Sequence, residues 1–398
     1  MLKDSIEIHN KRIKNRVVIQ PMEGADCNFN GAPSELTRKK YLNFAKSGAG
    51  IIWFEACAVC EEGKTNLRQM FLTEENVCEF RSLLDEMREI SIQENGFAPL
   101  TILQLTHSGR QSIRPMIAYR NPIYEEKRPV DDSMIVSDEY LDGLPDQFIH
   151  SARLAYEAGF DGVDVKCCHG YLMAELLSAY SREGKYGGSF ENRIRCFLNC
   201  FCGVKKAVPE DFLVVARLGL SDMVRKPYGF GTDEAGNLDL TEGKMLVSKL
   251  LENGLEILNI TLGNPYYNPH VNRPFRAGSY KAPEKPEVGI KRFYDVESEM
   301  KQCFPQLKII ATGLSYFRED LMQQAENLLK NNACDFVGFG RVSLAYPQFY
   351  KDYQKGNFNR NKCCVACSKC TLLMRAKCVS GCATFNSYYK NVFKEADL

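Results

Sequence analysis

A lysine, a histidine and a tyrosine stand close together directly after a short apolar run. The run is Gly162–Val165, and Lys166, His169 and Tyr171 follow it. Its β-branched character predicts a buried strand, so these three residues fall where the strand has ended and no helix has begun. An ammonium, an imidazole and a phenol at that point can direct hydrogen-bond donors at one ligand. The structural alternative is that Lys166 reaches solvent, His169 is a core histidine with satisfied hydrogen bonds and Tyr171 packs.

Strands and helices alternate along the chain in a way that would position these residues. Eight strands each followed by a helix predict a closed parallel barrel, although open doubly wound sheets show the same alternation. At a barrel's carboxyl end, polar residues are typically catalytic. The predicted strands are Val17–Pro21, Ile51–Glu55, Leu100–Leu105, Gly162–Lys166, Leu213–Leu218, Ile257–Ile260, Lys308–Ala311 and Phe336–Phe339. The predicted helices include Thr37–Ser47, Glu75–Glu94, Gln147–Ala158, Phe190–Val208, Thr241–Asn253, Val296–Cys303 and Arg318–Asn331.

Segments outside this alternation complete the expected organisation. Residues 5–16 predict a short hairpin with its turn at His9 to Lys11. Long irregular inserts run from Gly109 to Gly143 and from Asn264 to Gly289, and loops of this length on a barrel are typically lids or interfaces. We expect residues 1–350 to form the barrel and residues 351–398 a short cysteine-rich segment.

Several motifs of the chain resemble those of the Old Yellow Enzyme family of NADH:flavin oxidoreductases. They are DVKCCHGYL, which contains the three polar residues, LLSAYSREGKYGGSFENR after it, NRVVIQPM at 15–22 and QLTHSGR at 104–110. The most similar branch includes 2,4-dienoyl-CoA reductase and the bile-acid and steroid ene-reductases. This resemblance implies an α/β fold, the (β/α)8 TIM barrel, and FMN bound at its carboxyl end.

The resemblance also implies which residues contact the flavin ring. Pro21 and Met22 would lie under it, Ala56 would leave room beside it, Gln104 would bond its pyrimidine edge, and Arg217 would stabilise negative charge on it. Glu23 departs from the family, which usually has a small hydroxyl, a thiol or a histidine there. We hypothesise that Glu23 pairs with a cation such as Lys166; the alternative is a surface hydrogen bond.

Two glycine-containing turns predict a phosphate site with less reliance on the family. Gly313 and Leu314 follow the seventh strand, and Gly340 and Arg341 follow the eighth. Loops at these positions of barrels commonly bind phosphate. FMN fits better than a dinucleotide because no GxGxxG follows an early strand.

In the family, reduced flavin transfers hydride to the β-carbon of an alkene activated by a carbonyl, and a tyrosine protonates the α-carbon. The resemblance therefore implies an ene-reductase with Tyr171 as proton donor and with Lys166 and His169 binding the activating oxygen. The family usually has histidine where Lys166 stands, so a carboxylate substrate is also open. NADH or NADPH would supply the electrons.

The carboxyl-terminal segment carries Cys364, Cys367, Cys370 and Cys382. The family branch has four similar cysteines that ligate a 4Fe-4S cluster, with one residue more between the second and third. The C-x2-C-x2-C spacing suits such a cluster. Zinc and free buried thiols are the alternatives.

The composition excludes several classes of partner. Lys and Arg number 51 and Asp and Glu 50, which gives no global field for nucleic acid or an anionic membrane. No apolar run is long enough to span a bilayer, and no secretory signal is visible, so a cytoplasmic protein is expected. Expected partners are an unsaturated small-molecule substrate, with an external electron-donor protein and a homo-oligomer left open. Alternative functions are an iron-sulfur electron-transfer subunit, an amine dehydrogenase related to trimethylamine dehydrogenase, and a barrel for a phosphorylated substrate.

Overall fold

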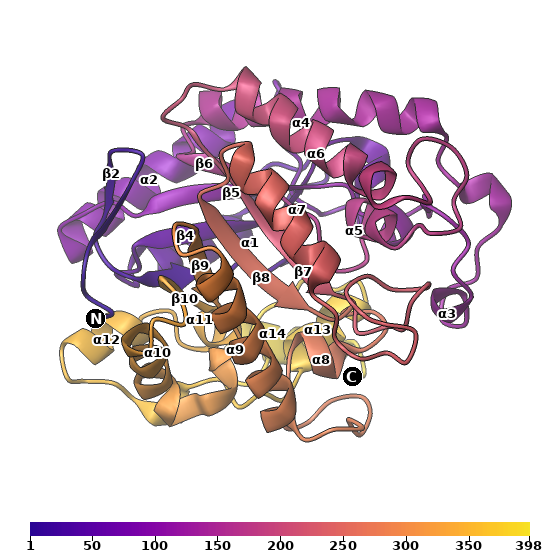
Figure 1. The fold of residues 1–398 in the computed structure, drawn as a ribbon. Helices are drawn as coiled ribbons and strands as arrows, with labels where there is room; N and C mark the ends of the chain where they lie inside the picture. The colour runs from indigo at the N-terminus through magenta and orange to yellow at the C-terminus, as the bar shows by residue number, and fades with distance from the viewer.

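A closed barrel of eight parallel strands forms the centre of the computed structural model, which describes residues 1–398. Each strand pairs with the next strand along the chain, and the last, β10, pairs with the first, β3, which closes the ring and confirms the predicted TIM barrel (Figure 1). All eight predicted strands are present. They are β3 (Val17–Ile19), β4 (Ile51–Ala58), β5 (Leu100–Thr106), β6 (Gly162–Val165), β7 (Leu213–Ser221), β8 (Ile257–Leu262), β9 (Lys308–Ala311) and β10 (Phe336–Phe339).

Fourteen helices accompany the strands, and the longer ones surround the barrel and bury their apolar faces against it. They are α1 (Glu35–Ala45), α2 (Val77–Asn95), α3 (Pro122–Glu125), α4 (Asp138–Ala158), α5 (Leu172–Leu177), α6 (Phe190–Ala207), α7 (Thr241–Glu252), α8 (Pro269–Asn272), α9 (Pro286–Cys303), α10 (Leu321–Lys330), α11 (Arg341–Ala345), α12 (Phe349–Gln354), α13 (Lys369–Arg375) and α14 (Ser387–Glu395). Short 3-10 turns occupy Glu61–Gly63, Gly109–Gln111, Asp132–Met134, Leu314–Asp320 and Arg360–Lys362.

Three helix boundaries differ from the prediction. Helix α4 starts nine residues earlier, at Asp138, because the Ser137 side chain caps it and the helix continues through Pro145. Helix α9 starts at Pro286, where a proline costs no hydrogen bond. The helix predicted at Arg318–Asn331 is a 3-10 turn followed by α10, because Arg318 adopts a positive φ of 52°.

The amino-terminal hairpin closes one end of the barrel. Strands β1 (Ile6–Ile8) and β2 (Lys11–Ile13) pair antiparallel, as predicted. Ile8 and Ile13 pack in one cluster with Trp53 and other residues that point into the barrel. In Figure 1 the indigo hairpin lies at one end, and β7 and β8 point toward the other, where α13 and α14 lie. The hairpin leaves only the carboxyl end of the strands open to a ligand.

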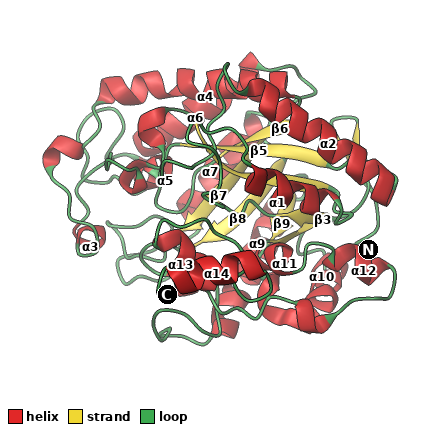
Figure 2. Ribbon diagram, turned by 180° about the vertical axis from the view of Figure 1, so that it is seen from behind, coloured by secondary structure: helices red, strands yellow, loops and turns green.

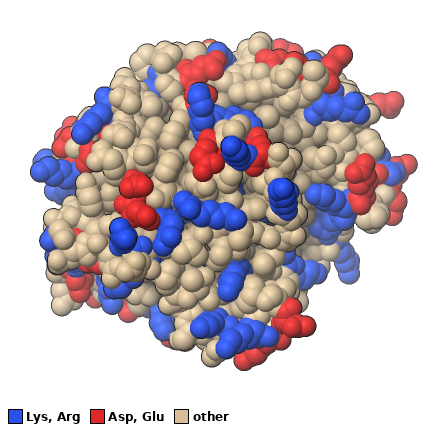
Figure 3. Space-filling view, turned by 90° about the horizontal axis from the view of Figure 1, so that it is seen from below, with Lys and Arg blue, Asp and Glu red and all other residues tan.

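The carboxyl-terminal segment covers this open end, and Figure 2 shows α13 and α14 in front of the strands. The Ser380 amide donates to the Gly24 carbonyl, 2.7 Å away, so the segment is joined to the loop after β3. Basic and acidic side chains are interspersed on the face shown in Figure 3, in line with a net charge of +1. No helix has both the length and the apolar character to cross a membrane. The division of the chain at residue 350 stays a prediction.

Candidate active site

A cavity of about 1180 Å³ opens at the carboxyl end of the strands, and we call it the barrel cavity. All but one of the residues predicted to bind the flavin or catalyse line it. The exception is Leu314, which is fully buried in the core and does not reach the cavity. The predicted residues that line the cavity are Pro21, Met22, Glu23, Ala56, Gln104, Lys166, His169, Tyr171, Arg217, Gly313, Gly340 and Arg341.

A tight turn after β6 directs Lys166, His169 and Tyr171 into the barrel cavity. His169 and Gly170 both adopt positive φ, 68° and 65°. A Cβ on Gly170 would lie 2.3 Å from the Asn264 amide nitrogen, so a larger residue would not fit there. Burial lowers the pKa of His169 well below its usual value, and its Nε2 has no hydrogen-bond partner. The imidazole is therefore neutral and has a free nitrogen for a ligand.

The Tyr171 hydroxyl lies 3.3 Å from the hydroxyl of Tyr266, which the sequence did not identify. Lys166 Nζ lies 4.1 Å from the centre of the Tyr171 ring and forms no hydrogen bond or ion pair. Burial raises the pKa of Tyr171 well above its usual value and lowers that of Lys166. The phenol therefore keeps its proton at neutral pH, and Tyr266 can stabilise the oxygen after that proton leaves.

The hypothesised ion pair between Glu23 and Lys166 is wrong. The Glu23 carboxylate instead accepts hydrogen bonds from Thr65 Oγ1 at 2.9 Å and Asn66 Nδ2 at 3.3 Å. Both donors lie in the loop after β4, and no local pattern predicted that this loop would lie beside residue 23. Lys166 therefore keeps its ammonium available to a ligand.

Gln104 is oriented by Asp164, a residue that the sequence analysis did not identify. Gln104 Nε2 donates to Asp164 Oδ2 at 2.6 Å, and Trp53 Nε1 donates to the same oxygen at 3.0 Å. Burial raises the pKa of Asp164 to about 6. With its amide nitrogen occupied, Gln104 presents its carbonyl oxygen to the cavity as an acceptor. The sequence did carry a signal for Asp164: an acidic residue between two valines, Val163 and Val165, in a strand that is predicted to be buried.

Three arginines meet at the side of the cavity formed by the loops after β9 and β10. Burial, followed by repulsion from Arg375 and Arg341, lowers the pKa of Arg273 to about 10. Arg273 Nε and Arg341 Nη1 are buried without a hydrogen-bond partner, as is Arg217 Nε elsewhere in the cavity. Glu23 is the only carboxylate that lines the cavity. Unpaired buried cations are costly, so this side of the cavity fits an anion such as the phosphate of FMN.

Gly313 gives that anion access to the backbone. Its φ is 86°, which side-chain-bearing residues rarely adopt, and no atom lies within 4 Å of where a Cβ would stand. Of the residues that sequence reasoning missed, Arg273 comes from the insert at Asn264–Gly289 and Arg375 from the cysteine segment. The length of the insert and the cysteines of the carboxyl-terminal segment predicted a functional role for both. They did not indicate which of their side chains point into the cavity.

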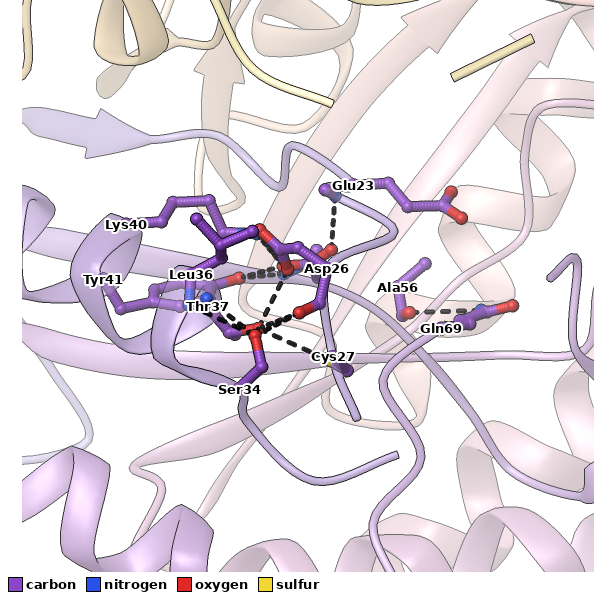
Figure 4. Close-up of polar contacts among 12 residues, drawn as sticks. Glu23, Asp26, Cys27, Ser34, Leu36, Thr37, Lys40, Tyr41, Ala56 and Gln69 are labelled. Carbon is purple, nitrogen blue, oxygen red and sulfur yellow. Dashed lines mark hydrogen bonds and ion pairs between the residues drawn. The ribbon is translucent and has the colours of Figure 1, made fainter. Parts of the chain in front are cut away.

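A buried ionic network holds the loop after β3 in place beneath the cavity (Figure 4). Lys40 Nζ donates to Asp26 at 2.9 Å and to Glu55 at 2.5 Å, and all three side chains are buried. Glu55 also accepts from the Gly24 amide at 2.6 Å and from the Tyr41 hydroxyl at 3.2 Å. The network therefore fixes the backbone next to Met22 and Glu23, which line the cavity.

The four predicted cysteine ligands line one cavity of about 330 Å³. We call it the cysteine cavity; Cys370 and Arg341 line both it and the barrel cavity. Positive φ at Ala366 and Ser368, 52° and 60°, makes tight turns that accommodate the short spacing between Cys367 and Cys370. No three of these thiols are arranged to hold a single metal ion. Four thiols that line one cavity are a donor set that could hold a 4Fe-4S cluster or zinc.

Comparison with known proteins identifies the family. The model of the NADH:flavin oxidoreductase / NADH oxidase family matches residues 2–359. The chain belongs to this family. The family resemblance seen in the sequence is thus confirmed.

Two curated relatives and one solved structure illustrate its place there. The chain is 27% identical to the NADH oxidase of Thermoanaerobacter brockii over 370 residues, 91% of this chain and 52% of the relative. It is 26% identical to the cinnamate reductase of Clostridium sporogenes over 386 residues, 93% of this chain and 55% of the relative. A 2-naphthoyl-CoA reductase structure superposes on 98% of this chain and 58% of its own with a TM-score of 0.81 at 21% identity, which supports the fold. The chain thus spans about half the length of these proteins.

Proposed function

We propose that the protein is an FMN-dependent ene-reductase that reduces the C=C bond of an α,β-unsaturated carbonyl or carboxyl compound. The observation that carries the proposal is that Tyr171, Lys166 and His169 face a single cavity. The other side of this cavity has arginines that form no ion pair with an acidic side chain. Pro21, Met22, Ala56 and Gln104 would hold the flavin ring, and Gly313, Gly340 and Arg341 its phosphate. The similarity to cinnamate reductase supports this class of substrate.

FMN, when bound and reduced, supplies the hydride that reaches the β-carbon. The chain's own residues supply the proton and the binding of the activating oxygen. Tyr171 donates its phenolic proton to the α-carbon, and the Tyr266 hydroxyl at 3.3 Å stabilises the oxygen that remains. Lys166 and His169 Nε2, neither of which has a partner, donate to the carbonyl or carboxylate oxygen and stabilise the enolate.

The cysteine cavity, we propose, holds a 4Fe-4S cluster bound by Cys364, Cys367, Cys370 and Cys382. Cys370 lines both cavities, so a cluster there would lie beside the flavin. Electrons would then come either from NADH or NADPH at the flavin or from an external donor protein through the cluster. The amine dehydrogenase alternative is disfavoured, because Lys166 and the arginines of the barrel cavity would repel a cationic amine.

The test uses the purified holoprotein and the variant Tyr171→Phe. We expect a flavin spectrum, NADH or NADPH oxidation that depends on an added enone, and a loss of enone reduction of about 100-fold or more in the variant. Flavin reduction by the nicotinamide should stay unchanged in Y171F, because the phenol acts only in the oxidative half-reaction. Lys166→Gln should weaken reduction without altering the flavin spectrum. A colourless protein that does not bind FMN would refute the proposal.

A further inference from the structure

A second cavity, of about 1450 Å³, adjoins the barrel cavity, and we call it the outer cavity. Glu23, Tyr266, Met374 and Arg375 line both. Its remaining wall comes from the loops after β4 and β5, from α3 and from the segment that follows β8. A molecule whose reacting end lies in the barrel cavity can therefore extend into the outer cavity.

The outer cavity is rich in cations that have no acidic partner. Lys127, Arg128, Arg375 and Lys377 line it, and none of them forms an ion pair. Arg128 donates only to neutral oxygens, Gln111 Oε1 at 3.3 Å and the Ser112 carbonyl at 2.8 Å. Burial, with repulsion from Arg110, lowers the pKa of Arg128. The arginine is thus held partly out of water beside another cation, which is unfavourable unless an anion joins them.

Buried polar atoms in the same wall also have no partner. Arg110 is 2% exposed, and Glu175 and the Tyr119 carbonyl bind its Nε and Nη2 but leave Nη1 unpaired. Ser112 Oγ is fully buried and also unpaired. The guanidinium of Arg110 lies 5.8 Å from the centre of the Tyr124 ring, so this buried cation is held by the wall beneath Arg128 and adds to the positive charge there.

Glu23 is the only carboxylate that lines the outer cavity, and it does not neutralise these cations. Its oxygen is already bonded to Thr65 and Asn66, on the side of the loop after β4. Arg110 belongs to the loop after β5, and Arg128 belongs to the residues that follow α3. An anion can therefore bind beside them without displacing a hydrogen bond of Glu23.

We infer that the outer cavity binds an anionic oxygen group, a carboxylate or a phosphate, carried by the substrate at a distance from the double bond that is reduced. The inference rests on the proposed ene-reductase activity and adds a determinant of specificity to it. Arg128 is its main donor, and the charge of the buried Arg110 supports it. The outer cavity then discriminates between charged and neutral substrates, whereas Lys166 in the barrel cavity binds the activating oxygen of both.

The test compares enones that differ only at the far end of an alkyl linker. Probes with a terminal carboxylate, a terminal phosphate or a terminal methyl ester are assayed with the FMN holoenzyme over a set of linker lengths. At the fitting length we expect kcat/KM for one or both anionic probes to exceed that of the ester by about tenfold or more. The ratio between the two anionic probes tells whether the site takes a carboxylate or a phosphate.

Arg128→Gln should reduce this preference about tenfold, mostly through KM, and leave kcat/KM for the ester unchanged. Arg128→Lys should retain part of the preference because it keeps the charge. Arg114→Gln is the matched control, since Arg114 is exposed in the same insert, before α3, and does not line the cavity. Equal kcat/KM for anionic and neutral probes at every linker length, or an unchanged preference in R128Q, would overturn the inference.

A thermal-shift assay separates failure of the inference from failure of the proposed activity. If no probe is reduced, the ester included, the ene-reductase proposal fails. In that case the anionic probes should still raise the melting temperature of the wild type more than the ester does, and R128Q should lose this difference. Equal shifts from anionic and neutral probes would then reject the anion site as well.

Discussion

Replacing Lys40 by methionine should destabilise the protein strongly, because it leaves two buried carboxylates without their cation. Lys40 is bonded to both Asp26 and Glu55, and each of the three side chains is at most 5% exposed. Removing one partner of a buried ion pair typically costs about 3–5 kcal/mol, since the remaining charge stays uncompensated. At about 2.1 cal/mol/K of unfolding entropy per residue, the 398-residue chain should then melt roughly 5 °C lower.

The penalty should depend on pH with a definite sign. Burial, opposed mainly by Lys40, raises the pKa of Glu55 from 4.5 to about 7 in the folded protein. A carboxyl with a raised pKa stabilises the folded state below its unfolded pKa, and this stabilisation is lost as pH rises through the folded value. Without Lys40 the pKa of Glu55 rises further. The melting-temperature difference between wild type and K40M should therefore be largest above about pH 7 and shrink toward about pH 5.

Melting curves followed by circular dichroism at several pH values provide the assay. Lys39→Met is the matched control, because Lys39 is the exposed neighbour on α1 and forms no ion pair, so its free energy of unfolding should change by less than about 0.5 kcal/mol. The double variant K40M/E55Q should recover part of the loss, since one uncompensated charge is gone. If K40M and K39M had the same melting temperature at about pH 8, the network would contribute nothing to stability and the reasoning would be refuted.

Further predictions concern the proposed cofactor sites and Lys166. Asp164→Asn should weaken FMN binding to the apoprotein about tenfold, measured by fluorescence titration, because Gln104 loses the partner that orients its amide. Cys370→Ser should lower the iron content of protein purified anaerobically from about four atoms per chain, while Cys378→Ser, which does not line the cysteine cavity, should leave it unchanged. The pKa of Lys166 is lowered, so enone reduction should decline with rising pH at a lower pH than a solvent-exposed lysine would give. Lys166→Gln should abolish that decline, and an identical pH profile would argue against the role of the ammonium.

Local sequence patterns predicted the eight strands, since each is a short apolar run, but their alternation with helices also fits an open sheet. The closed barrel was predicted mainly from the family resemblance. The local patterns also brought most of the predicted site residues to one cavity, because the strand ends of a parallel barrel meet at one end. The direction of the Leu314 side chain is a feature that this reasoning, which concerned the backbone N–H groups of the turn, did not address. Leu314 adjoins a glycine of the phosphate turn, yet the 3-10 turn that begins there directs its side chain into the core. Position in a loop does not fix side-chain direction.

Contacts between distant segments could not be predicted. The Glu23 carboxylate had an attractive cation in Lys166, but Thr65 and Asn66 from another loop bind it. Tyr266 and Arg273 come from an insert with no regular periodicity. Tyr266 lies beside Tyr171, and Arg273 lies near Arg341 and Arg375, only because the whole insert folds over the barrel in one particular way. This tertiary arrangement cannot be predicted from a local sequence pattern.

Residues 23 and 166 differ from those usual in the family, and the position of Glu23 explains how both can be tolerated beside a flavin. A carboxylate close to the flavin ring would oppose negative charge on its reduced form, yet hydrogen bonds from Thr65 and Asn66 hold this carboxylate on the wall that the barrel and outer cavities share. Lys166 is left free above Tyr171. The Glu23 carboxylate repels a negatively charged group that passes between the two cavities. Under the proposed function, the Lys166 ammonium attracts an oxygen of the substrate at the reacting end. With that function, the free lysine favours a substrate with a charged or strongly polar oxygen at the reacting end over one with a weakly polar group there.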